Sequence, residues 1–87
     1  MELLLLEYNK EKIKQEAEIQ YRELEFLEMF NQSELEYEKL EAKFKEIAAF
    51  QADLGSFRVR KLMEAKQFLT AEQSEKYKKI LLKIFFQ

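Results

Sequence analysis

The stretch MFNQSELEYEKL, residues 29–40, separates two long segments whose apolar residues recur with helical spacing. Asn31, Gln32 and Ser33 interrupt the apolar pattern. Ser33 followed by Glu36 has the sequence of a capping box, in which the Ser hydroxyl accepts from the N3 amide and the Glu carboxylate accepts from the cap amide. A short polar break between two helical patterns predicts a tight antiparallel hairpin.

The segment before the break predicts one helix over residues 2–30. Its apolar residues recur at spacings of three, four and seven, which is typical of a coiled-coil-like seam. Lys10 and Gln20 lie on the same stripe and weaken it. The apolar members of this seam are Leu3, Leu6, Ile13, Ala17, Leu24 and Leu27.

The segment after the break predicts a second helix over residues 34–69, which at about 1.5 Å per residue is more than about 50 Å long. So long a helix cannot bury its own apolar face, so we expect it to pack on the first helix and on a second chain. Gly55 in its middle is compatible with a bend or with a close helix crossing. The expected core stripe consists of Tyr37, Leu40, Phe44, Ile47, Leu54, Leu62, Ala65 and Phe68 or Leu69.

A second capping box, Thr70 with Gln73, predicts that the chain changes direction and begins a third helix over residues 71–86. This helix carries four lysines, and its expected apolar face consists of Tyr77, Ile80, Leu81, Ile84 and Phe85. The pattern is compatible with a helix that lies on a membrane surface. Docking on the long helices is the interpretation we favour. The prediction is therefore an all-α fold, a single domain over residues 1–87 made of a long antiparallel hairpin and a short C-terminal helix.

Composition narrows the function. The chain has 87 residues, 15 of them basic and 17 acidic, for a net charge of −2, so no global field favours nucleic acid. It contains no Cys and no His, which excludes disulfides and removes the commonest general base and the commonest transition-metal ligand. Gly55 is the only glycine, so no glycine-rich phosphate loop exists. We expect no enzyme and no cofactor. The apolar run of Leu3 to Leu6 is too short for a signal peptide or a membrane span.

The order of these elements resembles one protein family. A polar hairpin, a long second helix containing FRVRKLMEAKQF, the LTAEQ stretch and a basic, aromatic last helix are similar to the periplasmic Spy/CpxP-type proteins and their ZraP-like and CnrX-like relatives. The LTxxQ motif of that family is matched by Leu69, Thr70 and Gln73, and the similarity covers roughly residues 30–87. An earlier copy of the motif, usual in the family, is missing from this chain.

The resemblance implies an exported, periplasmic hairpin that forms a homodimer through its long helices. It also implies either ATP-independent chaperone activity toward unfolded proteins or sensing of heavy metals. In the sensor-type relatives a His and a Met lie four residues apart before LTxxQ, and the matching positions here are Lys61 and Ala65. Neither residue can ligate a transition metal, so we expect no metal site.

The sequence therefore leads us to expect a non-enzymatic envelope stress protein that binds unfolded or partner proteins. Long cationic side chains that alternate with apolar ones can hold a client through both kinds of contact. A heavy-metal sensor or resistance domain and a purely structural coiled-coil dimerisation module are the alternatives. A solvated helix face that pairs with acidic residues is the simpler interpretation of the same stretch. The expected client-binding residues are Phe57, Arg58, Arg60, Lys61, Leu62, Met63 and Lys66.

Overall fold

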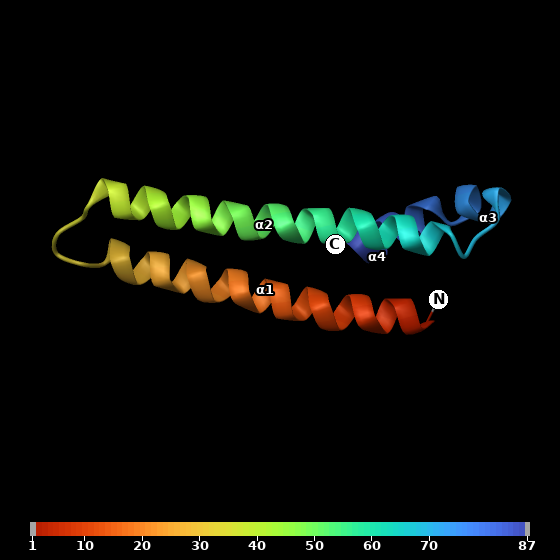
Figure 1. The fold of residues 1–87 in the computed structure, drawn as a ribbon, viewed down its shortest axis with the longest axis horizontal. Coiled ribbons are helices and arrows are strands. Elements are labelled where there is room, and N and C mark those ends of the chain that lie inside the picture. The colour runs from red at the N-terminus through yellow and green to blue at the C-terminus, as the bar shows by residue number, and fades with distance from the viewer. Residues whose placement is uncertain (1, 87) are drawn as a thin grey trace.

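The computed structural model describes residues 2–86, so Met1 and Gln87, the ends of the expected domain, lie outside it. The described residues form four helices: α1 (Glu2–Phe30), α2 (Tyr37–Lys66), α3 (Ala71–Lys76) and α4 (Lys78–Phe86). α1 and α2 run antiparallel, and α4 folds back along α2 (Figure 1). The described chain measures 58 × 19 × 15 Å. The prediction of an all-α hairpin with a C-terminal helical segment is confirmed.

The turn between the long helices differs from the prediction. α2 begins at Tyr37 instead of residue 34, and its cap residue Glu36 is extended and makes no side-chain capping bond. The predicted capping box of Ser33 and Glu36 is therefore wrong. The backbone amides of Asn31 and Gln32 still donate to carbonyls of α1, at 3.0 and 3.3 Å, so α1 uses the start of the polar break for its own end. Ser33 is left in the turn, three residues before the cap.

The second capping box is confirmed. The Gln73 amide donates to the Thr70 hydroxyl at 3.1 Å, and the Thr70 amide donates to the Gln73 side chain at 3.1 Å. α2 ends at Lys66 instead of residue 69 because the next three backbone amides donate three residues back, in a tighter turn. The helix predicted over residues 71–86 is interrupted at Tyr77 (φ −99°, ψ 11°), which separates α3 from α4.

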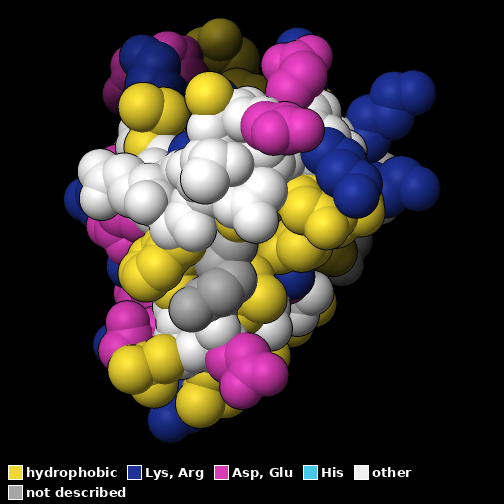
Figure 2. Space-filling model, turned by 90° about the vertical axis from the view of Figure 1, so that its right-hand side faces the viewer, with side chains coloured by type: hydrophobic (Ala, Val, Ile, Leu, Met, Phe, Trp, Pro, Cys, Tyr) yellow, Lys and Arg dark blue, Asp and Glu magenta, His cyan; other side chains and the backbone are white. Residues whose placement is uncertain are grey.

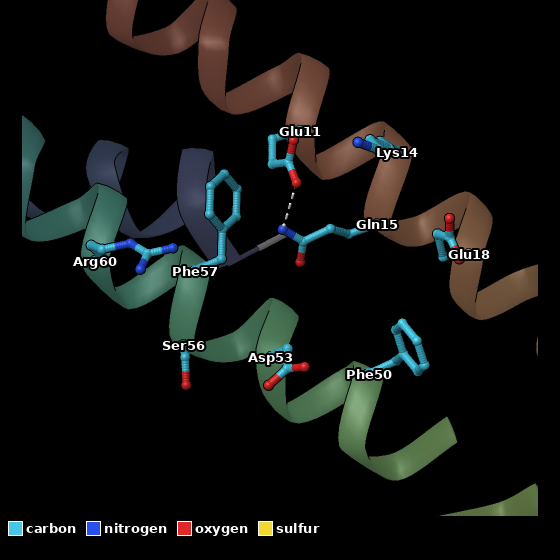
Figure 3. Close-up of a pocket in the computed structure, with 9 residues that line it drawn as sticks. All are labelled: Glu11, Lys14, Gln15, Glu18, Phe50, Asp53, Ser56, Phe57 and Arg60. Atoms are coloured by element: carbon cyan, nitrogen blue, oxygen red, sulfur yellow. Dashed lines mark hydrogen bonds between the residues drawn. The ribbon is translucent and has the colours of Figure 1, made fainter. Parts of the chain in front are cut away.

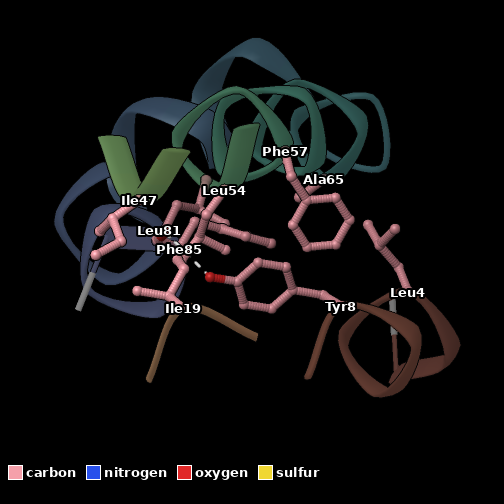
Figure 4. Packing of buried hydrophobic residues seen from close by; sticks show 9 residues of the cluster. All are labelled: Leu4, Tyr8, Ile19, Ile47, Leu54, Phe57, Ala65, Leu81 and Phe85. Atoms are coloured by element: carbon pink, nitrogen blue, oxygen red, sulfur yellow. Dashed lines mark hydrogen bonds between the residues drawn. The ribbon is translucent and has the colours of Figure 1, made fainter. Parts of the chain in front are cut away.

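The core lies between α1, α2 and α4, and Tyr8 is at its centre (Figure 4). The Tyr8 ring stacks on Phe57, with 5.6 Å between ring centroids, and meets Phe85 of α4 edge-on at 4.7 Å. The Tyr8 hydroxyl donates to the backbone carbonyl of Phe85 at 3.1 Å. One side chain thus joins the three helices. The buried hydrophobic residues among 2–86 are Leu4, Tyr8, Ile19, Ile47, Leu54, Phe57, Ala65, Leu81 and Phe85.

The seam predicted on α1 does not face α2. Each of its five large residues is between 53% and 69% exposed. Leu4, Tyr8 and Ile19 face the core instead, and at 100° per residue they lie about half a turn away from the seam. α1 therefore has two apolar faces, one buried and one open. We call the open face the outer seam: Leu3, Leu6, Ile13, Ala17, Leu24 and Leu27.

The expected apolar stripes of α2 and of the last helix are buried only in part. Ile47, Leu54 and Ala65 are buried, and Leu62 and Leu69 pack against the core from its edge. Tyr37, Phe44 and Phe68 are more than 60% exposed. In α4, Leu81 and Phe85 are buried and Ile84 packs against the core, whereas Ile80 and Tyr77 are exposed. α4 covers one end of the hairpin, but Phe68 at that end is exposed, and Ile47, nearer the turn, is buried.

Gly55 lies within the continuous helix α2, and a Cβ atom placed on it would meet nothing within 4 Å. The close-crossing interpretation therefore finds no crossing element among the described residues. Alanine at this position would therefore cause no clash. It would also replace the most flexible residue type by the best helix former.

We predict that Gly55→Ala stabilises the protein by about 0.5–1 kcal/mol, because it lowers the conformational entropy of the unfolded chain. Urea unfolding followed by circular dichroism measures the change. Ala52→Gly, at an exposed position of the same helix, is the matched control and should destabilise by a similar amount. A loss of stability in Gly55→Ala would contradict the open surroundings of this residue.

Candidate functional site

The seven residues expected to form one client surface do not share a face. Phe57 is a core residue, 5% exposed, so it does not lie on an open surface of the chain. Leu62 packs against the core from its edge. Arg58 and Lys61 are largely covered and paired. Arg58 Nη2 lies 3.3 Å from Glu16 Oε1 of α1, and Lys61 Nζ lies 3.1 Å from Glu64 Oε2. The alternation of cationic and apolar residues here follows the helical packing of α2.

The remaining three residues, Arg60, Met63 and Lys66, are exposed. Val59 and Met63 are 51% and 59% exposed, and with Lys66 they follow the four- and three-residue spacing of one helix face. Core residues Leu54, Phe57 and Ala65 point to the other side of α2. The part of the predicted surface that the structure keeps together is therefore a mixed stripe of Val59, Met63 and Lys66, flanked by Arg60.

A polar junction joins α4 to the hairpin. The Phe85 carbonyl is in the last turn of α4, where backbone carbonyls have no intrahelical donor, and the Tyr8 hydroxyl supplies one. Burial raises the pKa of Tyr8; Arg58 opposes the increase and Glu16 adds to it. Arg58 uses Nη2 for Glu16, and its Nε is buried with no hydrogen-bond partner among the described residues. Arg58 is thus a bridge between α1 and α2.

A second group of ion pairs links the helices nearer the turn. Arg22 Nε lies 3.0 Å from Glu46, and Lys43 Nζ lies 3.4 Å from Glu25 and 3.2 Å from Glu46. Hydrogen bonds from Lys43 and then Arg22 lower the pKa of Glu46. The guanidinium of Arg22 also covers the Phe50 ring, 3.8 Å from its centroid. These exposed pairs fix which residues of α1 and α2 face each other more than they add stability.

Among residues 2–86, grooves run between α1 and α2 at several places along the hairpin. The first, of about 420 Å³, is lined by charged and polar side chains over Phe50 and Phe57 (Figure 3). Gln15 donates to Glu11 at 3.2 Å across one helical turn, and Ser56 points away from α1 in Figure 3. No hydrogen bond among the described residues joins Ser56 to a carboxylate.

The second groove, which we call the turn groove, is mainly apolar and has a volume of about 330 Å³. Phe26 and Ile47 belong to the core or pack against it, so the floor of the groove continues the core toward the turn. Phe44 and Ala48 are exposed along its α2 side. Its lining residues are Glu23, Phe26, Leu27, Phe44, Ile47, Ala48 and Gln51.

The end of the molecule that carries α3 has both acidic and basic side chains. Figure 2, which views that end, shows Lys and Arg side chains projecting beside an apolar patch. Among residues 2–86, no group of three or more potential metal-ligating side chains comes together. Within the same residues, no helix is long and apolar enough to cross a membrane.

Sequence reasoning missed the inner face of α1. Leu4, Tyr8, Ile19 and Phe26 share one side of the helix at spacings of four, eleven and seven, which was the available signal. The polar residues Lys12 and Gln15 fall within this stripe and break its periodicity. The outer seam has the more regular heptad spacing, and for that reason the sequence predicts that the seam faces the core.

No protein-family model, no curated protein and no solved structure matches this chain. The resemblance to the LTxxQ family therefore rests on the motif and on the order of the helices.

We predict that Tyr8→Phe destabilises the protein by about 1 kcal/mol near pH 8, because it leaves the Phe85 carbonyl without its donor. The folded state favours the neutral phenol, so the unfolded chain ionises first, near the ordinary value of 10.0. The wild-type advantage should therefore shrink as the pH rises from about 10 through the raised pKa of Tyr8. Urea unfolding of both proteins at about pH 8 and about pH 11 measures it. An unchanged or wider gap at the higher pH would contradict the buried neutral phenol.

Proposed function

We propose that the chain is a non-enzymatic helical module that binds protein through the outer seam of α1, with a second copy as its partner in a homodimer formed through the long helices. One observation carries this proposal. Seventeen large hydrophobic residues are exposed among residues 2–86, whereas the buried hydrophobic residues number nine and include the small Ala65. A small protein that leaves more large apolar residues outside than inside has surface that a partner would cover.

The spacing of the outer seam favours a helix as that partner. Leu3, Leu6, Ile13, Leu24 and Leu27 occupy the alternating three- and four-residue positions at which two helices interdigitate. Lys10 and Gln20 occupy two further positions of the same seam. Polar residues at such positions lower the affinity of the pair and fix its register. The seam thus has the character of a specific helix-pairing surface.

We predict that Leu6→Gln and Ile13→Gln together shift the protein from dimer toward monomer in sedimentation equilibrium. Two buried large apolar side chains lost per protomer raise the dissociation constant by at least about 100-fold. The protomer should keep its helical signal, because both residues are exposed within it.

Leu35→Gln is the matched control, since Leu35 is 53% exposed but lies in the turn. It should leave the association unchanged. A wild-type protein that remains monomeric at all accessible concentrations would overturn the homodimer, and equal effects of the seam and control variants would overturn the assignment of the seam.

Binding of unfolded proteins in the cell envelope is the second candidate, supported by the family resemblance and by the stripe of Val59, Met63 and Lys66 beside Arg60. These exposed side chains combine apolar area with positive charge, a mixture that suits varied clients. Leu62 and Phe57 contribute through the core that holds the stripe in place. A periplasmic location rests on the resemblance.

We predict that the protein suppresses light scattering by a chemically unfolded, acidic client at low salt, and that Arg60→Glu with Lys66→Glu weakens this suppression. Both cations are exposed, whereas Arg58 and Lys61 are paired inside the protomer and would report on folding instead. Lys45→Glu is the control on the same helix. Equal suppression by the wild type, the double variant and the control would show that these charges play no part in binding. No suppression by the wild type would overturn this candidate function.

A further inference from the structure

The turn groove resembles the surface of α1 and α2 on which α4 packs, and it lies farther along the hairpin. Phe26 comes 18 residues after Tyr8, and Ile47 comes 18 residues before Ala65. Eighteen residues are about five complete helical turns, so the members of each pair lie on the same side of their helix. Tyr8 and Ala65 are buried in the cluster that includes Leu81 and Phe85 of α4 (Figure 4), and Ile47 lies at the end of that cluster nearer the turn, with Phe26 packed against it. Phe26 and Ile47 occupy the equivalent positions toward the turn.

The edges of the two places correspond in the same way. Phe44 comes 18 residues before Leu62, which packs against the core at the end that α4 covers. Phe44 itself is 64% exposed. The same pair of helices thus presents apolar side chains at three corresponding positions, whereas the counterparts of the core residues Leu4 and Phe57 are Arg22 and Lys39.

The size of the turn groove suits an occupant similar to α4. α4 has nine residues, or about 13 Å of helix, and it inserts Leu81 and Phe85, four residues apart. The α2 edge of the groove, from Phe44 to Gln51, extends for about 10 Å. A groove of this length holds two turns of helix, with apolar anchors at positions i and i+4.

The charge around the groove favours a basic occupant. Glu23 lines it and takes part in no ion pair among the described residues. The basic residues nearest the groove, Arg22, Lys39, Lys43 and Lys45, are each paired with a glutamate. The glutamates from 23 to 41 that take part in no ion pair among the described residues are Glu23, Glu28, Glu34 and Glu38. By contrast, α4 and the residues before it carry Lys76, Lys78, Lys79 and Lys83 and no acidic residue from 76 onward.

We propose that the turn groove binds a short, basic, amphipathic helix of a partner protein. Such a helix inserts two apolar or aromatic side chains over Ile47 and between Phe26 and Phe44, and its lysines face the glutamates near the turn. The same kind of contact, apolar side chains of a short helix inserted between α1 and α2, holds the chain's own α4 in place. The site is separate from the outer seam, apart from Leu27, which borders both.

An amide-capped peptide with the sequence of residues 76–86, KYKKILLKIFF, is the probe. Titrated into isotopically labelled full-length protein, it should shift the NMR amide signals of Phe26 and Ala48 more than those of Tyr8 and Leu62. A peptide in which the four lysines are replaced by glutamates should not bind. Raised salt should weaken the binding of the basic peptide, because exposed charges are screened.

Ala48→Glu and Ala49→Glu form a matched pair. Both alanines are exposed neighbours on α2, but only Ala48 lines the groove. Placing a carboxylate under the apolar anchors should weaken peptide binding at least about tenfold for Ala48→Glu. Ala49→Glu should leave it within about twofold.

Three results would overturn the proposal: no shifts at a peptide concentration of about 1 mM, shifts centred on Tyr8 and Leu62, which indicate exchange with the seated α4, or equal effects of Ala48→Glu and Ala49→Glu. Because Ala48 and Ala49 lie outside the outer seam, these outcomes are independent of the dimer test. The seam variants Leu6→Gln and Ile13→Gln should still bind the peptide if the dimer proposal fails.

Discussion

The contact of Tyr8 with Phe57 and Phe85 is the interaction on which the rest of the structure depends. Its ring is enclosed between α2 and α4, and its hydroxyl satisfies a carbonyl at the end of α4. Few buried residues support this hairpin, so one aromatic cluster decides which side of α1 faces inward. Once Tyr8 points into the core, the heptad positions of α1 must point outward.

Local signals predicted the helices well and the packing less well. The polar break, the Thr70 capping box and the helical periodicity were enough for the hairpin and its C-terminal segment. The cap at Ser33 failed because α1 uses the first residues of the break to end its own helix. The buried face of α1 could not be predicted because the helix carries two regular apolar patterns. Which of the two is buried is decided by the contact of Tyr8 with Phe57 and Phe85.

The same competition explains the fate of the candidate site. The basic stretch of α2 contains core, bridging and exposed residues in turn, because a helix packed on one side distributes neighbouring residues among all three settings. Phe57 was assigned to a client surface for its proximity in sequence to Arg58 and Arg60. In space it belongs with Tyr8. Exposed apolar surface remains at the outer seam, at the stripe at Met63, in the turn groove and at the end that carries α3.

Thiol labelling of single-cysteine variants tests the two-faced helix most directly, because the chain has no cysteine of its own. Cysteine is placed in turn at Leu4, Ile19, Leu6, Ile13 and Leu24, and labelling rates are measured in dilute and in concentrated protein. The account predicts slow labelling at Leu4 and Ile19 at every concentration. It predicts fast labelling at the three seam positions that slows as the protein is concentrated. Slow labelling of the seam in the dilute monomer, with fast labelling at Leu4 and Ile19, would contradict the account. It would mean that the seam, and not the face of Leu4 and Ile19, is buried against α2.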